Sequence, residues 1–304
     1  MKIIFFGSSR FVLPVIEMLK KNVELALVVT TETDPLDTVP AYCQQNNIPY
    51  LSVAKLDAQA QERIKQIGAP VAVLGYFGIL LPQVALEIFP KGILNIHPSL
   101  LPKYRGPTPV QSAILNGDSE TGVTIIKLDR EMDHGPILAQ EKETILPTDT
   151  TVTLHDRLFT KGAKLLETAI PEYLSGNLLP KEQNHEAATL TKRGFTRQDG
   201  FIALSEMEHM SPLEIENWKL EIARMIRAYY PWPAVWFTAR IKKKEVRIKL
   251  LPASVCHPEL VSGSYASCCL QVEGKKPVSL KDFLNGYPEL HETIMKLIPS
   301  EIDG

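Results

Sequence analysis

In the first two thirds of the chain, short β-branched runs alternate with amphipathic stretches, and this alternation constrains the fold more than any other feature. The pattern predicts an α/β fold with a doubly wound, mostly parallel sheet. The expected strands are Lys2 to Phe6, Leu25 to Thr30, Pro70 to Gly75, Gly92 to Ile96, Gly122 to Leu128 and Ile137 to Gln140. The expected helices are Phe11 to Lys20, Ala41 to Asn47, Ala58 to Ile67 and Pro82 to Phe89.

A second domain is expected after a long helical pattern from Val152 to Leu174. The composition then turns polar from Lys181 to Gly200, which predicts a linker. Beyond it, a helical stretch from Glu214 to Ala228 precedes two strand-like runs, Ala234 to Ile241 and Val246 to Leu251, joined by a charged turn. We therefore expect an N-terminal α/β domain over residues 1–180, a linker over 181–200 and a small β-barrel domain over 201–304.

Composition excludes several classes of function. The formal net charge is -2, with 22% charged residues, so any site for a polyanion must be local. No C-x-x-C spacing joins the four cysteines, which predicts free thiols at Cys43, Cys256, Cys268 and Cys269 and no metal site. No leader pattern opens the chain, and no apolar stretch approaches the roughly 20 residues of a membrane span. A cytoplasmic, monomeric protein without membrane association is expected.

The turn from Gly7 to Phe11 follows a strand and precedes a helix, where phosphate-binding loops occur. It contains one glycine, whereas a dinucleotide loop needs several for the backbone to approach a pyrophosphate. A plain tight turn is therefore preferred to an NAD site, and an anion near the helix start stays open.

Two polar residues mark the end of one expected strand. Asn95 and His97 flank Ile96, so the two-residue period of a strand places both polar side chains on one face. Pro98 and Pro102 end the strand, and open α/β sheets bind ligands at the carboxyl ends of their strands. From these residues alone, an Asn–His pair that only satisfies buried backbone groups stays an alternative.

A carboxylate in the turn between two expected neighbouring strands completes the candidate site. From this turn, Asp133 is able to reach His97 across the top of the sheet. A histidine beside a carboxylate is a candidate acid or base. Asp129, in the same turn, is interpreted as a turn former.

Three motifs carry a resemblance to a known family: N-I-H-P-S-L-L-P-K-Y-R-G at 95–106, G-D-S-E-T-G-V-T at 117–124 and M-D-H-G-P-I-L at 132–138. They resemble the signature of the 10-formyltetrahydrofolate-dependent formyltransferases. With F-F-G-S-S-R-F, G-Y-F-G-I-L-L-P, I-R-A-Y-Y-P-W-P and L-Q-V-E-G-K-K-P, the whole chain resembles the methionyl-tRNA formyltransferases of that superfamily. The resemblance implies a Rossmann-like formyltransferase fold and a C-terminal OB-like β-barrel that binds tRNA.

The resemblance also implies roles for particular residues. Asn95, His97 and Asp133 are implied to catalyse formyl transfer without a metal. The formyl donor, 10-formyltetrahydrofolate, is implied to bind Tyr76, Phe77, Gly78, Ile79, Leu80, Ser99, Leu100, Leu101, Pro102, Leu128 and Met132. Lys103 and Arg105, just beyond the strand, are expected to contact the acceptor end of methionyl-tRNA, the substrate in translation initiation. Clustering of basic residues adds Lys192 and Arg193 in the linker and Lys242, Lys243, Lys244 and Arg247 in the hairpin as expected contacts to tRNA phosphates.

Two departures from the family pattern bear on the acceptor. The loop from Thr31 to Thr38 is short and acidic where the tRNA enzymes have a long basic loop, and the stretch between Leu251 and Leu270 lacks a strand pattern. In favour of RNA, residues 191–304 carry 16 Lys and Arg against 14 Asp and Glu, while residues 1–190 carry 17 against 21. Alternatives are the formylation of an amino sugar nucleotide and a catalytically inactive RNA- or folate-binding module.

Overall fold

The computed structural model describes residues 1–31, 38–256 and 268–298, and the chain folds into two compact units. The first unit contains Met1–Pro109, Glu120–Thr144 and His155–Thr191. The second contains Val110–Ser119, Ile145–Leu154 and the chain from Lys192 onward. The domain boundaries expected at residues 180 and 200 stay a prediction, and residues 181–191 belong to the first unit.

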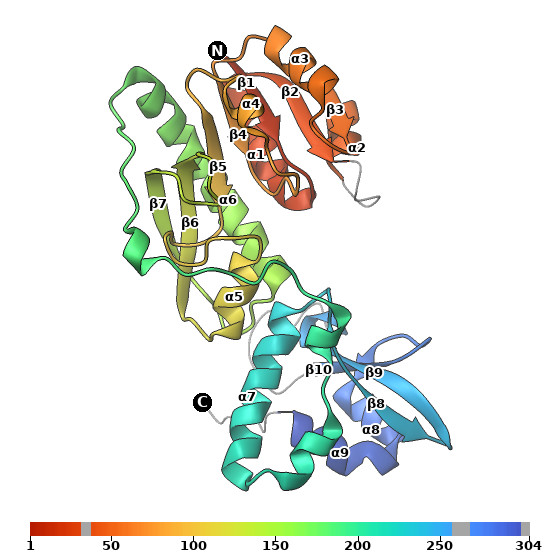
Figure 1. The fold of residues 1–304 in the computed structure, drawn as a ribbon. Helices are drawn as coiled ribbons and strands as arrows, with labels where there is room; N and C mark the ends of the chain where they lie inside the picture. The colour runs from red at the N-terminus through yellow and green to blue at the C-terminus, as the bar shows by residue number, and fades with distance from the viewer. Residues whose placement is uncertain (32–37, 257–267, 299–304) are drawn as a thin grey trace. The chain divides into compact units, whose positions relative to one another are not determined.

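A seven-stranded sheet forms the centre of the first unit, in the order β3-β2-β1-β4-β5-β6-β7 (Figure 1). Neighbouring strands are parallel from β3 to β5, whereas β6 pairs antiparallel with both β5 and β7. The predicted mostly parallel sheet is therefore confirmed. The strands are β1 (Lys2–Phe6), β2 (Glu24–Thr31), β3 (Tyr50–Val53), β4 (Val71–Leu74), β5 (Ile93–His97), β6 (Glu120–Lys127) and β7 (Ile137–Thr144).

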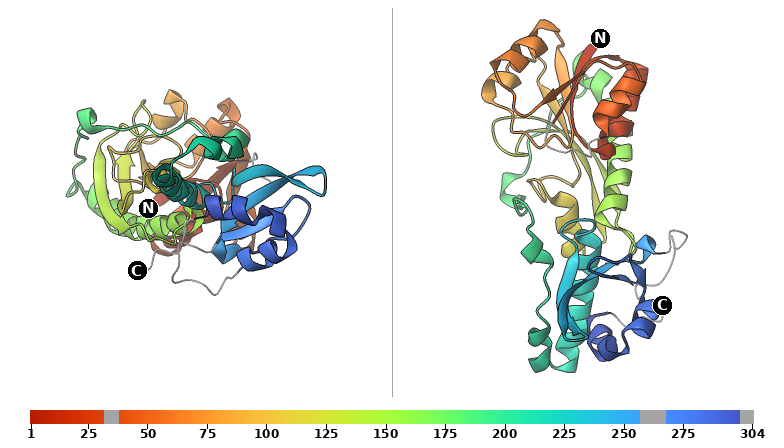
Figure 2. Two further views of the ribbon diagram at one scale, coloured as in Figure 1. Left: turned by 90° about the horizontal axis from the view of Figure 1, so that it is seen from below. Right: turned by 90° about the vertical axis from the view of Figure 1, so that its right-hand side faces the viewer.

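Helix α6 packs closely on the middle of this sheet. A Cβ atom at Gly162 would lie 2.8 Å from the side chain of Ile96 and 3.2 Å from that of Val123, so glycine permits the close approach. Ile96 therefore faces α6, and its neighbours face the other side of β5. Figure 2 shows α3 and α6 on opposite faces of the sheet. The helices of the first unit are α1 (Leu13–Asn22), α2 (Val39–Gln45), α3 (Ala58–Gln66), α4 (Gln83–Leu86) and, from His155 onward, α6 (Thr151–Ser175). Helix α5 (Pro109–Leu115) belongs to the second unit from Val110 onward.

Two local predictions differ from the structure. Strand β3 was not predicted, because of its four residues only Val53 is buried and the segment lacks an apolar run. Helix α4 is shorter than the predicted Pro82 to Phe89, and Phe89 lies beyond it. The Phe89 side chain is buried and packs against Phe6, with ring centroids 6.1 Å apart. Burial of this ring competes with extension of the helix.

A four-stranded antiparallel sheet, in the order β11-β10-β9-β8, lies in the second unit. The small antiparallel sheet expected in the C-terminal region is confirmed, and its closure into an OB-like barrel stays a prediction. Helix α7 (Pro212–Ala228) begins with a capping box, in which Ser211 Oγ accepts from the Glu214 N–H and the Glu214 carboxylate accepts from the Ser211 N–H. The strands and remaining helices are β8 (Val235–Ile241), β9 (Lys244–Pro252), β10 (Cys268–Val272), β11 (Val278–Ser279), α8 (Leu280–Gly286) and α9 (His291–Leu297).

Strands β8 and β9 form the predicted hairpin with a tighter turn than expected. Ile241 pairs with Lys244, so Lys242 and Lys243 alone make the turn. Both have positive φ values, 46° and 68°, which is the backbone form that two-residue hairpin loops favour. Three consecutive lysines therefore lie at the tip of the hairpin.

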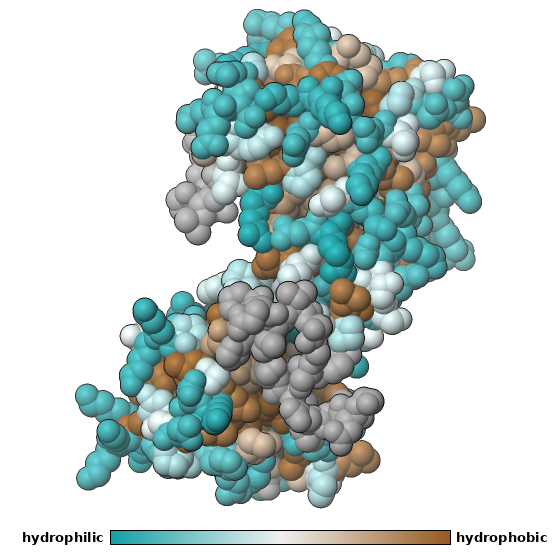
Figure 3. All heavy atoms as spheres, turned by 180° about the vertical axis from the view of Figure 1, so that it is seen from behind, coloured by the Kyte–Doolittle hydropathy of each residue, from teal (hydrophilic) through white to brown (hydrophobic). Residues whose placement is uncertain are grey.

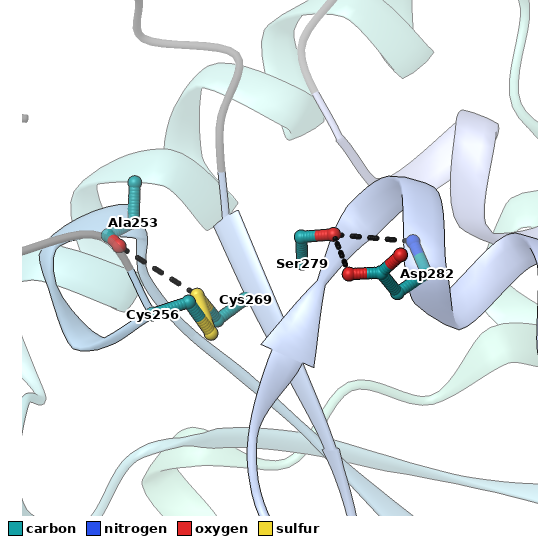
Figure 4. The surroundings of a disulfide bond; sticks show 5 residues. All are labelled: Ala253, Cys256, Cys269, Ser279 and Asp282. Atoms are coloured by element: carbon teal, nitrogen blue, oxygen red, sulfur yellow. Dashed lines mark hydrogen bonds between the residues drawn. A yellow bond between two sulfur atoms is a disulfide. The ribbon is translucent and has the colours of Figure 1, made fainter.

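The cysteine prediction was wrong for two of the four residues. Cys256 and Cys269 form a disulfide, with their Cα atoms 6.2 Å apart (Figure 4). Pairing of β9 with β10 brings the turn after β9 beside the start of β10, a contact that cysteine spacing does not reveal. Cys43 and Cys268 are buried thiols outside this disulfide, and burial raises the pKa of the Cys268 thiol to about 12.

On the face drawn in Figure 3, hydrophilic and apolar side chains lie side by side. Within the described part of the chain, no helix has the length and apolar character to cross a bilayer. Most of the acidic loop Thr31 to Thr38, and most of the unpatterned stretch between Leu251 and Leu270, lie outside the described residues.

Candidate active site

The three candidate catalytic side chains meet at the carboxyl end of β5. The amide of Asn95 donates from Nδ2 to Oδ1 of Asp133 at 3.3 Å. Nδ1 of His97 lies 3.5 Å from the same oxygen. The side chain of His97 is 4% exposed and that of Asp133 12%, so the contacts are shielded from bulk water. Asn95, His97 and Asp133 were predicted to lie at one edge of the sheet, and the structure brings them into contact there.

The loop between β6 and β7 holds Asp133 in a conformation that is uncommon outside glycine, with a φ of 50°. Its second oxygen, Oδ2, accepts a hydrogen bond of 2.8 Å from the backbone N–H of Gly106. Gly106 itself has a φ of 117°, and a Cβ atom there would overlap the hydroxyl of Thr191. A glycine at 106 therefore allows the backbone N–H to reach the carboxylate.

Both ring nitrogens of His97 have defined neighbours. Nε2 lies 2.9 Å from the carbonyl oxygen of Tyr104. Because a carbonyl oxygen only accepts, Nε2 carries a hydrogen in this contact. Nδ1 is the ring nitrogen that faces Asp133.

The loop after β5 is hydrogen-bonded to β6 and β7. Thr124 Oγ1 donates to the carbonyl oxygen of Ser99 at 2.6 Å and accepts from the backbone N–H of Leu101 at 3.2 Å. Gln140 on β7 donates to the carbonyl oxygen of Leu101 at 2.9 Å. Ser99 Oγ donates to the carbonyl of Lys103 at 2.6 Å. These bonds hold the loop that supplies the Tyr104 carbonyl and the Gly106 N–H.

The stretch over residues 181–200, which was expected to be a linker, is hydrogen-bonded to the same loop through Thr189. Thr189 donates from its backbone N–H to the Pro102 carbonyl at 3.2 Å and accepts from the Arg105 N–H at 2.8 Å. Its hydroxyl oxygen accepts from the Tyr104 N–H at 2.8 Å. Sequence reasoning missed Thr189 and Tyr104, because a polar stretch gives no sign of such pairing.

Residues predicted to bind folate occupy varied environments. Tyr76 and Leu80 are 45% and 84% exposed, whereas Phe77 is 3% exposed and packs in the core against Phe6. Met132 is 59% exposed. Ser99 and Leu101 are buried, Leu128, Ile79, Leu100 and Pro102 are partly buried, and Gly78 is exposed with a φ of 72°.

A hollow of about 350 Å³ lies between the α4 region and the turn after β6. Its wall includes Leu86, Phe89 and Leu128, with Gln83 and Arg130 among its polar groups. Leu128 is one of the predicted folate residues. Five of its eleven lining residues are polar or charged, and its volume falls in the range of small-molecule sites.

The predicted acceptor contacts divide between the two units. In the first unit, Lys103 is exposed, whereas Arg105 is 8% exposed and its guanidinium donates to the side chain of Gln183. In the second unit, Lys192 pairs with Asp199. Hydrogen bonds, first from Lys192 and then from the Thr196 backbone, lower the pKa of Asp199 to about 2.

The remaining predicted contacts belong to the second unit. Arg193, Lys242, Lys243 and Lys244 are exposed. Arg247 stacks on the ring of Trp236 at 4.8 Å, with Glu273 3.8 Å away. Arg193 and the hairpin lysines therefore offer exposed positive charge in this unit.

Comparison with known proteins identifies the family. The model of the formyl transferase family matches residues 1–170. A methionyl-tRNA formyltransferase of Chloroflexus aurantiacus is 39% identical over 249 residues, which cover 78% of this chain and 76% of that protein. The chain belongs to the formyl transferase family. The family resemblance seen in the sequence motifs is confirmed.

Similarity to members of the formyl transferase family extends along almost the whole chain. The methionyl-tRNA formyltransferase of Thermus thermophilus is 33% identical over 309 residues, covering 94% of this chain and 96% of that protein. A solved structure of WlaRD, a sugar 3N-formyl transferase in the presence of dTDP and 5-N-formyl-THF, superposes with a TM-score of 0.58 at 20% identity. That match covers 92% of this chain and 98% of WlaRD, and it shows the shared fold.

Proposed function

We propose that this formyltransferase moves a formyl group from 10-formyltetrahydrofolate to the amino group of methionyl-tRNA. The observation that carries the proposal is the contact of Asp133 Oδ1 with both Asn95 and His97 at the end of β5. The names of the relatives from Chloroflexus aurantiacus and Thermus thermophilus, similar over most of the chain, support the acceptor. Formylation of methionyl-tRNA places the enzyme in translation initiation.

Asn95 would stabilise the charge that develops on the formyl oxygen during transfer. One hydrogen of its amide is donated to Asp133, and a primary amide has a second hydrogen to offer. Held in a shielded site, this donor is pre-positioned for negative charge that exists only in the transition state. A single such donor contributes about 3 kcal/mol in oxyanion holes.

His97 and Asp133 would handle the proton. In its protonated form, His97 would present a positive charge beside the reacting carbonyl, 3.5 Å from the Asp133 carboxylate. The same carboxylate accepts the proton that the attacking amine loses, directly or through a water. The Gly106 N–H on Oδ2 keeps Oδ1 directed at His97 and Asn95.

The hollow that Leu86, Phe89 and Leu128 line in part is the candidate site for the ring of a folate donor. When bound, that donor supplies the formyl carbon. Leu128 directly follows β6 in the chain, and the β6–β7 turn leads from it to Asp133. Side chains in this turn would therefore orient the donor ring and hold the catalytic carboxylate.

The hairpin lysines support tRNA as the acceptor. Lys242, Lys243 and Lys244 are exposed at the hairpin turn, where three ammonium groups form a local site for a phosphate backbone. Because the whole chain has a net charge of -2, any site for a polyanion has to be local, and these three lysines provide such a site. An amino sugar nucleotide is the second candidate, favoured by the shared fold with WlaRD.

A formyl-transfer assay with methionyl-tRNA and with amino sugar nucleotides, run in parallel with the same donor, tests the proposal. Turnover of methionyl-tRNA at a kcat/KM at least 100-fold above that of any sugar is the expected result. Turnover of a sugar alone would assign the chain to the second candidate. If the protein formylates neither acceptor, the remaining hypothesis is a catalytically inactive RNA- or folate-binding module.

A further inference from the structure

The buried amide of Gln183 holds the loop that carries Asp133. The Gln183 side chain is 5% exposed. Its Nε2 donates to the backbone carbonyl oxygens of Asp133 at 2.8 Å and of Gly135 at 2.7 Å. These bonds use both hydrogens of the amide nitrogen. The side chain of Gln183, 50 residues from Asp133 in the sequence, is thus hydrogen-bonded to the loop at two residues.

Arg105 determines which way the Gln183 amide faces. The guanidinium donates from Nε and Nη2 to Gln183 Oε1 at 3.1 and 2.8 Å. Guanidinium nitrogens only donate and carbonyl oxygens only accept, so the amide oxygen faces Arg105 and the amide nitrogen faces the loop. Arg105 is itself buried, and its Nη2 also contacts Nδ1 of His185 at 2.8 Å.

The loop needs these external bonds. Asp133 has a φ of 50°, a conformation that residues other than glycine rarely adopt without support from their surroundings. Its carboxylate contacts Asn95 and His97 at 3.3 and 3.5 Å, so a small shift of the backbone would break both contacts.

We propose that Gln183 is a positioning residue for formyl transfer. It fixes the backbone from Asp133 to Gly135, and Arg105 fixes Gln183 in turn. The inference rests on the proposed function, because it assigns Gln183 to the geometry of the same reaction. Gln183 acts through Asp133 and needs no contact with either substrate.

Gln183→Glu tests the proposal with little change in shape. The carboxylate keeps its contact with Arg105, but it presents oxygen to the carbonyls of Asp133 and Gly135, which repel it. The expected result is a fall in kcat of roughly 10- to 100-fold, because misplacement of about 1 Å has that order of effect. The KM values for both substrates should stay within about threefold. Gln59→Glu, an exposed site in the first turn of α3, is the matched control and should leave kcat unchanged.

A double variant separates positioning from general damage. In an Asp133→Asn background, the Gln183→Glu substitution should lower kcat less than about threefold further, because its effect passes through the carboxylate. If Gln183→Glu lowers kcat in the Asp133→Asn background as much as it does in the wild type, the proposal is overturned. A wild-type kcat in folded Gln183→Glu protein would overturn it as well.

Gln183→Met covers the case in which the glutamate variant does not fold. The methionine side chain has a length similar to that of glutamine but carries no charge and no amide hydrogens. We therefore expect the same loss of kcat with a steady KM. A wild-type kcat would overturn the proposal. Absence of formyl transfer to methionyl-tRNA by the wild-type protein would instead refute the proposed function. Normal turnover by Asp133→Asn would refute the role of Asp133.

Discussion

Nδ1 of His97 and Oδ1 of Asp133 lie 3.5 Å apart, and Nε2 of the same imidazole faces the carbonyl of Tyr104. The ring is therefore held in one orientation, with Nδ1 toward the carboxylate. If this pair carries out the proposed proton transfer, we expect catalysis to depend on the charge of Asp133 more than on its shape.

Asp133→Asn is expected to lower kcat by at least about 100-fold, because the amide does not accept a proton from the amine. The amide oxygen still accepts from the Gly106 N–H, so the loop should keep its conformation. Steady-state kinetics and a donor-binding titration check this, with unchanged donor affinity expected. Near-normal turnover would rule out the proton-transfer role.

His97→Ala is expected to lower kcat by about 100- to 1000-fold, the range seen when a transition-state donor is removed. The KM for methionyl-tRNA should change little, since the buried imidazole is 4% exposed and acts on charge that forms during the reaction. His291→Ala, at an exposed position that starts α9, is the matched control. A KM effect without a kcat effect would contradict the assignment.

The hairpin is tested by replacing its three lysines with residues that preserve the turn. Lys242→Asn, Lys243→Gly and Lys244→Gln together keep the positive φ values of the turn and remove its charge. We expect a higher KM for methionyl-tRNA and a flatter dependence of KM on salt, by roughly one unit of log–log slope per lost phosphate contact. Donor affinity should not move.

A matched control for the hairpin removes three exposed lysines of the first unit, Lys21, Lys55 and Lys65, by substitution with glutamine. The net charge then falls equally. Parallel salt plots with equal KM for the hairpin variant and the wild type would refute tRNA binding by the hairpin and favour a small acceptor.

Lys192→Met is expected to raise the pKa of Asp199 from about 2 toward its ordinary value of 3.8, because the hydrogen bond from Lys192 is the largest cause of the lowering. A lowered carboxyl pKa stabilises the fold above pH 3.8, and that contribution is lost as the pH falls through about 2. The variant should therefore lose the part of this contribution that Lys192 supplies, at all pH values above 3.8, whereas the part from Thr196 stays. A carboxyl NMR titration of Asp199 checks it, and an unchanged pKa would contradict the pairing.

The sequence predicts the parts of this protein that periodic patterns encode. Asn95 and His97 were placed on one face because a strand alternates, and Asp133 was placed near them because β6 and β7 are neighbours. Strand β3 has no apolar run, and the pairing of Cys256 with Cys269 follows from the register of β9 and β10, so neither is visible in the sequence.

Contacts that depend on distant pairing were also missed. Gln183 and Arg105 are 78 residues apart, and their bond has no local sequence signal. The polar stretch around Gln183 is typical of a linker, yet burial of one amide there determines the geometry of the Asp133 loop. Polar composition shows that a segment lacks an apolar core face, and it does not show which single side chain is buried.

The pairing of the post-α6 segment with the first unit sets the smallest fragment that keeps the catalytic geometry. Lys181 exchanges two backbone hydrogen bonds with Ile137 on β7, and Thr191 donates to the Arg105 carbonyl. A fragment cut at residue 170, where the family match ends, would lose these bonds and also Gln183. Any dissection or fusion of this enzyme that aims to preserve the active-site loops has to carry the chain through Thr191.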